Sequence, residues 1–277
     1  MRRVSLPLKT KVSLPANLPK WIDSRQTSGL YFFIREDAIQ TLKLSDAAFK
    51  MAASRLQKKG RIQRILGGFY IIIPLEYSPT RVLPADWFIA DLMNHIGQPY
   101  YVGLLTAAAI HGAAHQQPME FQVVTPHPLR TIKAKNLTVH FFHKTHFAAT
   151  PTNTVKVQTG FMHISSPEAT AIDLIRYARA IGGIDRVYTV LQELGEKLKP
   201  AGLLEAIGAD GKIAYAQRLG FLLEKAGYEN TKLEPIYQWV KNRKTMPTLL
   251  DPSLSAQRAK EKNRWNVLIN TVLENEL

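Results

Sequence analysis

The sequence predicts an α+β protein of two domains. Its 277 residues give room for two hydrophobic cores. Positive charge is concentrated in the first third of the chain. At Pro74, Pro79 and Pro84 the pattern changes from a helix-rich part with few strands to a mixture of strands and helices. We therefore place a domain boundary in this linker, with residues 1–83 in the first domain and residues 84–277 in the second.

Charge is distributed unevenly along the chain. The whole chain carries a formal net charge of +14, and residues 1–83 hold 15 Lys or Arg against 5 Asp or Glu. The remaining residues hold 21 against 17. This asymmetry indicates that the first domain meets a polyanion, for which nucleic acid is the most plausible kind. The alternative is a solvated basic face kept for solubility.

The composition excludes some kinds of site and favours a cytoplasmic protein. Because the chain has no cysteine, it forms neither disulfides nor thiolate metal sites. No apolar run approaches the roughly 20 residues that cross a bilayer. Arg2 and Arg3 resemble the start of an export signal, but lysines and prolines follow where an apolar segment is needed. We expect a cytoplasmic protein without a membrane partner.

Local signals in the first domain predict the element order of a winged helix-turn-helix. The proline-punctuated residues 1–20 form a basic arm. Ser45 is a good N-cap for a helix with Asp46 in its first turn, and Gly60 ends that helix. A glycine pair starting at Gly67 separates two strand-like runs and predicts a hairpin. The expected elements are a short helix around Trp21, a strand at Gly29–Ile34, helices at Arg35–Leu42 and Asp46–Lys59, and a hairpin of Arg61–Leu66 with Phe69–Ile73.

The helix at Asp46–Lys59 is the predicted DNA reader. Its apolar stripe faces the core, and its other side is rich in cations. A helix fits the major groove, where Arg and Lys bond guanine edges and Ser bonds bases or phosphates. Cations at the helix end and on the first hairpin strand suit phosphates. The candidate DNA-binding residues are Ser45, Lys50, Met51, Ser54, Arg55, Lys58, Lys59, Arg61 and Arg64.

Some roles in this region stay open. Met51 either touches a thymine methyl group or covers apolar surface. Phe69, Ile71 and Ile73 are expected to hold the hairpin on the core. A small helical domain with lysines outside would explain the cations without DNA, but seven cations against one acid in residues 43–64 disfavour it. Winged helices also serve as protein-interaction modules.

The second domain is expected to combine a sheet with helices, because alternating and helical patterns are interspersed. Strands are predicted at "FQVVT", "NLTVHFF" and "TVKVQTGFMHI". A buried helix is predicted within "VGLLTAAAIHGAA", and a last element in "RWNVLINTVLENEL". Further helices are predicted at Ala85–Ile96, Pro167–Ala180, around Val187–Leu198, at Ala201–Ile207 and at Ile213–Lys225.

The histidines do not predict a metal site, although all eight lie within residues 95–163. In a strand, His140 and His143 point to opposite faces. His111 and His115 share a helical face, but the glutamate that follows the first histidine in a zinc protease is missing. We expect no metal and no cofactor.

No pattern predicts an active site either. The segment "HISSPEATAIDLI" lacks the glycines of a nucleophile elbow. Ser165 and Glu168 have the spacing of a capping box, and Pro167 suits a first helical turn. Asp173 lies among apolar neighbours, so we expect it to hold a structural hydrogen bond. We predict no catalytic residue.

Four stretches together resemble the AbiEi family of antitoxins and transcriptional regulators. They are the segment ending "GGFYIII", then "PYYVGLLTAAAIHGAAHQQP", "SSPEATAIDLI" with a later "GG", and "AQRLGFLLEKAG". The likeness covers roughly residues 30–230. The basic arm before Trp21 is longer than in the family, and the chain after Lys232 matches only loosely.

The resemblance implies a function in two parts. The first domain would bind double-stranded DNA at operator inverted repeats and repress its own operon. The second would act as an antitoxin against a nucleotidyltransferase toxin, without a stable complex between them. Two alternatives remain. One is a nucleic-acid-processing enzyme with an unrecognised site in residues 84–277, for which Asp173 and Glu120 are the carboxylates to test. The other is a protein-interaction scaffold whose basic face meets an acidic partner.

Overall fold

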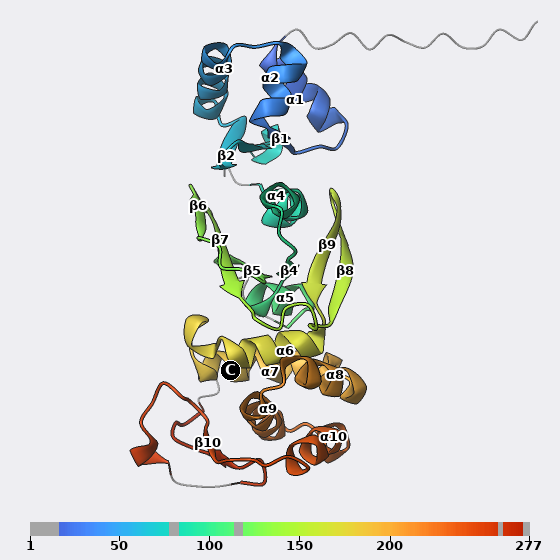
Figure 1. Cartoon of the computed structure of the whole chain (residues 1–277), viewed down its shortest axis with the longest axis vertical. Coiled ribbons are helices and arrows are strands. Elements are labelled where there is room, and N and C mark those ends of the chain that lie inside the picture. Colours follow the sequence, from blue (N-terminus) through green and yellow to red (C-terminus); the bar gives the residue numbers. More distant parts are fainter. Residues whose placement is uncertain (1–16, 78–82, 114–118, 260–262, 274–277) are drawn as a thin grey trace, which may run out of the picture. The chain divides into compact units, whose positions relative to one another are not determined.

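The computed structural model describes residues 17–77, 83–113, 119–259 and 263–273. The chain divides into two compact units, Met1–Phe88 and Ile89–Leu277, and each unit is considered by itself (Figure 1). Residues 1–16 of the basic arm, part of the proline linker and His115 lie outside the described residues, whereas residues 18–20, expected in the arm, belong to a helix. The mixture of helices and strands confirms the α+β class. Within the described part of the chain, no helix is long and apolar enough to span a membrane.

The first unit alternates helices with the strands of one small sheet. Three strands pair antiparallel in the order β1-β3-β2. The elements are α1 (Leu18–Thr27), β1 (Phe32–Ile34), α2 (Arg35–Leu42), α3 (Asp46–Lys58), β2 (Ile62–Leu66), β3 (Phe69–Ile72) and two 3-10 turns, Leu75–Tyr77 and Ala85–Trp87.

Capping residues fix the ends of these helices. The side chain of Asn17 accepts a hydrogen bond from the backbone N–H of Lys20 at the start of α1, and Ser45 Oγ accepts one from Ala48 at the start of α3. The predicted N-cap at Ser45 is therefore confirmed. Between α2 and α3 the chain turns through Lys43, whose φ of 51° is in the left-handed region typical of a helix end.

Aromatic side chains fill the core between the helices and one face of the small sheet. Trp21 of α1 meets Phe33 edge-on at 5.5 Å, and Phe49 of α3 meets Tyr70 edge-on at 5.8 Å. Ile72 joins the same cluster. The hairpin is thus held on the helices by Tyr70 and Ile72 of β3.

The hairpin residues predicted to do this lie on the other side of the strand. Phe69, Ile71 and Ile73 are each at most 1% exposed, but they alternate with Tyr70 and Ile72 and so point to the opposite face. The predicted burial of these three residues is therefore confirmed, and both faces of β3 are buried, as a continuous apolar run allows.

A mixed six-stranded sheet forms the first part of the second unit. Its order is β6-β7-β5-β4-β9-β8, with parallel pairs β5–β7 and β4–β9. Hairpins β6–β7 and β8–β9 form its two edges (Figure 1). The strands are β4 (Tyr101–Val102), β5 (Phe121–Thr125), β6 (Ile132–Ala134), β7 (Leu137–His143), β8 (Thr152–Val157) and β9 (Gly160–Ser165). Helix α4 (Ile89–Ile96) precedes β4, and α5 (Leu104–Ile110) lies between β4 and β5 in the chain.

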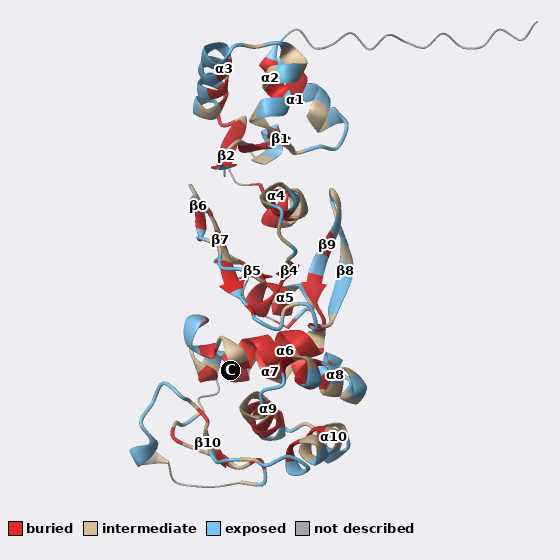
Figure 2. Ribbon diagram, in the orientation of Figure 1, coloured by how far each residue is buried: buried red, intermediate tan, exposed pale blue. Residues whose placement is uncertain are grey.

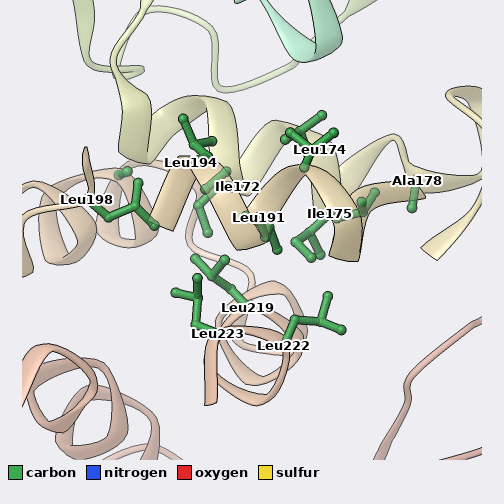
Figure 3. Packing of buried hydrophobic residues seen from close by; sticks show 14 of the residues in the cluster. Ile172, Leu174, Ile175, Ala178, Leu191, Leu194, Leu198, Leu219, Leu222 and Leu223 are labelled. Carbon is green, nitrogen blue, oxygen red and sulfur yellow. The ribbon is translucent and has the colours of Figure 1, made fainter. Parts of the chain in front are cut away.

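Helices and a short strand pair form the rest of this unit. Almost all of α6 is buried (Figure 2), and Leu219, Leu222 and Leu223 of α9 lie across from α6 and α7 in one apolar cluster (Figure 3). The elements are α6 (Pro167–Arg176), α7 (Ile184–Leu194), α8 (Pro200–Asp210), α9 (Ile213–Lys225), α10 (Asn230–Lys241) and the parallel pair β10 (Thr248–Leu249) with β11 (Val267–Leu268).

Two predictions are wrong in detail, and one helix of the second unit was not predicted. The helix expected at Ala85–Ile96 is interrupted at Phe88, whose φ of −138° is not helical. The N-cap of α6 is Ser166, whose side chain accepts from Ala169 N, whereas Ser165 Oγ bonds Thr170. The capping-box spacing therefore pointed one residue too early. In addition, α10 was not predicted at all.

Candidate nucleic-acid interface

The cationic helix α3 presents most of its predicted residues to solvent. Phe49, Ala53 and Leu56 form its buried stripe. Because residues three and four apart share a helix face, the remaining positions form an outer face (Figure 2). That face carries the exposed side chains of Lys50, Met51, Ser54, Arg55 and Lys58.

Acidic residues near the start of α3 form ion pairs with some of the cations in this region. Lys50 Nζ lies 3.4 Å from Asp46, one turn earlier, and the Lys50 side chain is 73% exposed. Asp46 also binds the guanidinium of Arg35, which is 3.0 Å from Glu36. Exposed pairs of this kind contribute at most about 1 kcal/mol, so Lys50 can exchange Asp46 for a phosphate at little cost.

The remaining predicted cations differ in their exposure and in whether they form an ion pair within the protein. Lys59 follows α3, and Arg64 projects from β2; both are exposed. Alternation places Arg64 on the same face of the sheet as Ile62, which packs in the cluster with α3. Arg61 is different, because its guanidinium lies 2.7 Å from Asp23 and its side chain is only 20% exposed. Of the three, Arg61 is the one already committed to a partner within the protein.

The tip of the hairpin is tied to α2. The carbonyl of Gly68 accepts a hydrogen bond of 2.8 Å from the backbone N–H of Arg35, and Gly68 has a φ of 82°, which favours glycine. This hydrogen bond fixes the turn of the hairpin next to the start of α2. The exposed charge of the hairpin comes from Arg64 on β2. Ser45 lies at the start of α3, exposed and already bonded to Ala48 N.

A buried network of charged and hydroxyl groups lies within the second unit. Asp173 is fully buried; Tyr101 Oη donates to its Oδ2 and Lys144 Nζ to its Oδ1, each at 2.7 Å. Asp210 lies 3.8 Å from Lys144 and 2.9 Å from Arg176. The predicted structural hydrogen bonding of Asp173 is confirmed, whereas Lys144 was not identified from the sequence.

Burial dominates the electrostatics of this network. It raises the pKa of the Asp173 carboxyl above its usual value, while Lys144 and the Tyr101 hydroxyl oppose the shift. Burial likewise raises the pKa of Tyr101 well above its usual value. Asp173 is 0% exposed, and its bond to Lys144 joins α6 to the residue that follows β7.

Two of the histidines highlighted by the sequence, His111 and His140, have structural partners. His111 Nε2 donates to the carbonyl of Ser165 at 2.8 Å, and burial lowers the pKa of His111. His140 Nδ1 lies 3.0 Å from the carboxylate of Glu120. Among the described residues, no three His, Asp or Glu side chains gather as metal ligands would.

Comparison with known proteins places the second unit in a family. Residues 101–225 match the family described as the AbiEi antitoxin C-terminal domain. Residues 101–225 form a domain of the AbiEi antitoxin family. The resemblance inferred from the sequence is thereby confirmed, and the buried network of Tyr101, Lys144, Asp173 and Asp210 lies inside the matched segment. AbiEi antitoxins are regulatory proteins of toxin–antitoxin systems.

One solved structure shares the fold over nearly the whole chain. The "Crystal structure of RV2827C protein from Mycobacterium tuberculosis" aligns with a TM-score of 0.60, covering 93% of this chain and 94% of that one at 17% sequence identity. At this identity the likeness supports the fold alone. No curated protein matches the sequence.

Proposed function

We propose that this AbiEi antitoxin is also a sequence-specific DNA-binding repressor of its own operon. In this proposal the first unit reads operator inverted repeats in double-stranded DNA, and the second limits a nucleotidyltransferase toxin without forming a stable complex with it. The protein would act in the cytoplasm. The observation that carries the proposal is the outer face of α3, which is cationic while its inner face is fully packed.

The arrangement around α3 supports DNA binding. Helix, strand, helix, helix and hairpin follow in the order of a winged helix-turn-helix, and the strand order is β1-β3-β2. The second helix of such a motif reads the major groove. The exposed side chains of Ser54 and Arg55 would then meet base edges, while Lys58, Lys59 and Arg64 would meet phosphates. Met51, at 59% exposure, is free to touch a thymine methyl group.

The two parts of the proposal are separable by mutation. Arg55→Ala removes a predicted base contact from the first unit and leaves the matched antitoxin segment intact. We expect this variant to lose repression of a reporter placed behind its own promoter, and still to protect cells that express the toxin. Loss of protection together with repression would show that the two activities do not divide between the units as proposed.

DNA binding is tested directly by fluorescence anisotropy with the duplex upstream of the gene. Because one good bidentate base contact is worth about 1–3 kcal/mol, Arg55→Ala should weaken specific binding by roughly 5- to 150-fold and reduce the preference over scrambled DNA. Lys133→Ala is the matched control, since Lys133 is an exposed cation of the second unit. Equal affinities for the wild type and both variants would refute the proposed reader.

The structure does not favour the enzymatic alternative. Asp173 is enclosed by Tyr101 and Lys144, and Glu120 is engaged with His140. A nuclease or nucleotidyl-transfer activity lost in Asp173→Asn, with the fold intact, would revive that alternative.

A further inference from the structure

The two edge strands of the large sheet differ in how well they are protected from a further strand. The sheet has β6 at one edge and β8 at the other (Figure 1). The strand β6 has three residues and carries the exposed Lys133, and the exposed Lys135 follows in the turn to β7. Short length and lysines are common means by which an edge strand avoids pairing with another chain.

The strand β8 lacks this protection. It has six residues, of which Thr152, Asn153, Thr154 and Lys156 are exposed (Figure 2). Its pairing with β9 runs through all six residues without a β-bulge, and it contains no proline. Four of the six residues are Thr or Val, which favour strands. A long, regular and exposed edge strand of this kind is a template for pairing with a further strand.

The hydrogen bonds between β8 and β9 determine which backbone groups of β8 point outward. Ser166 N donates to the carbonyl of Pro151 at 3.0 Å. Hydrogen-bonded and non-hydrogen-bonded positions alternate along an antiparallel pair. The residues whose N–H and C=O point away from β9 are therefore Thr152, Thr154 and Lys156. Among the described residues no strand pairs with this side of β8, so it offers three donors and three acceptors.

From these features we propose that two copies of the chain join through their β8 strands, paired antiparallel about a two-fold axis at Thr154. With the axis at this residue, Thr154 stands opposite Thr154 of the second copy, and Thr152 stands opposite Lys156 of the second copy. All three outward positions then become hydrogen-bonded pairs, and six bonds form between the copies. The contact has two-fold symmetry, which is the commonest symmetry of protein oligomers.

The position of the axis follows from the outward groups. An axis one residue away, at Asn153 or Val155, would pair only two of the three outward positions within β8. With the axis at Thr154, the direct cross-strand pairs are Thr154 with Thr154, Thr152 with Lys156, and Asn153 with Val155. No pair places like charges opposite each other, which would be destabilising, and a Thr–Thr pair is favourable.

The side chains of β8 favour its own copy over a strand of another protein. Lys156 is the one charged residue of this strand, so β8 has no charge pattern that would select a differently charged partner. A second β8 matches it in length and in the spacing of its outward groups. A two-fold dimer would also present two copies of α3, as the two halves of an inverted repeat require, but the proposal concerns the second unit and does not depend on DNA binding.

Sedimentation equilibrium of the full chain without DNA tests the dimer. The chain has a mass of 31.2 kDa, and we expect the apparent mass to rise towards twice this value as the concentration increases through the micromolar range. A wild type that stays monomeric throughout this range would overturn the proposal. Because no DNA is present, failure of this test is distinct from failure of the proposed DNA reader.

Thr154→Pro removes the outward N–H at the axis without removing a hydrogen bond between β8 and β9. Two of the six bonds between the copies are lost, so dimerisation should weaken by roughly 5- to 150-fold. Lys133→Pro is the matched control, because the two-residue turn after Ala134 places Lys133 at the corresponding outward position of β6. This control should leave dimerisation unchanged.

Thr154→Lys changes the same position and keeps the backbone N–H. It places like charges opposite each other at the axis, which should also weaken dimerisation. A dimer that neither Thr154 variant weakens would overturn the proposal, because the copies would then join through another surface.

Cross-linking tests the register of the two strands. The chain has no cysteine, so Thr154→Cys introduces a single thiol. The two Cα atoms at position 154 would lie about 5.5 Å apart, within the range that a disulfide bridges. In Asn153→Cys they would lie roughly 8 Å apart, which is beyond that range. Under air with copper phenanthroline as catalyst, we expect covalent dimers from Thr154→Cys and few from Asn153→Cys. Equal cross-linking of the two variants would overturn the proposed pairing.

Discussion

Replacing Lys144 with methionine is expected to destabilise the second unit strongly. Lys144 is 3% exposed and its ammonium lies 2.7 Å from Asp173, which is fully buried. Removing one partner of a buried pair leaves the other charge uncompensated, at a cost of about 3–5 kcal/mol. Typical total stabilities are about 5–15 kcal/mol, so this single change removes a large part of the folding free energy.

The loss should depend on pH in a defined direction. Burial already raises the pKa of Asp173 above its usual 3.8, and Lys144 opposes that rise. For an acid whose folded pKa is raised, stability is greatest below the unfolded pKa and falls as pH rises through the folded pKa. Without Lys144 the folded pKa rises further. The difference in stability between wild type and Lys144→Met should therefore be smaller near pH 5 than near pH 8.

Urea unfolding followed by tryptophan fluorescence measures this at both pH values. Lys133→Met, which removes an exposed lysine from the same sheet, should change the free energy of unfolding by no more than about 0.5 kcal/mol. In the double variant Lys144→Met with Asp173→Asn, the side chain at position 173 is neutral and still accepts from Tyr101, so stability at pH 8 should recover in part. A loss in Lys144→Met that is below about 1 kcal/mol, or that is independent of pH, would refute the reasoning.

Two further predictions concern packing and capping. Gly220→Ala should lower the free energy of unfolding by about 1–3 kcal/mol, because the added Cβ would overlap the buried ring of Trp265. Gly208→Ala has open space around it and should stabilise its helix by up to about 1 kcal/mol. Equal melting temperatures of the two variants would contradict this. Ser45→Ala should destabilise the first unit by about 1 kcal/mol, because α3 loses its N-cap. Ser54→Ala, on the exposed face of the same helix, should not. Amide hydrogen exchange measures the difference, and equal exchange rates in both variants would count against the cap.

The elements that the sequence predicted well are those set by local chemistry. The expected bounds of α2 agree with the structure. Ser45 caps α3, and a glycine pair turns the hairpin between β2 and β3. In each case, the determining groups lie within a few residues of the feature. The inward stripe of α3 followed from helical periodicity for the same reason.

The features that the sequence did not predict depend on distant parts of the chain. Pro235 stands inside α10, and proline is a strong signal against a helix, so tertiary packing of Leu233 and Ile236 decides this element. Lys144 meets Asp173 across 29 positions of sequence, which no spacing rule captures.

The salt dependence of DNA binding tests the central proposal most directly. If Lys59 and Arg64 bind phosphates, each alanine variant should weaken binding to all duplexes similarly, and the slope of log K against log salt should become shallower by about 0.9 for each phosphate that is no longer neutralised. Arg55→Ala should instead reduce sequence preference with a smaller change in slope. Identical affinities and slopes in the wild type and all three variants would contradict the assignment of this surface to DNA.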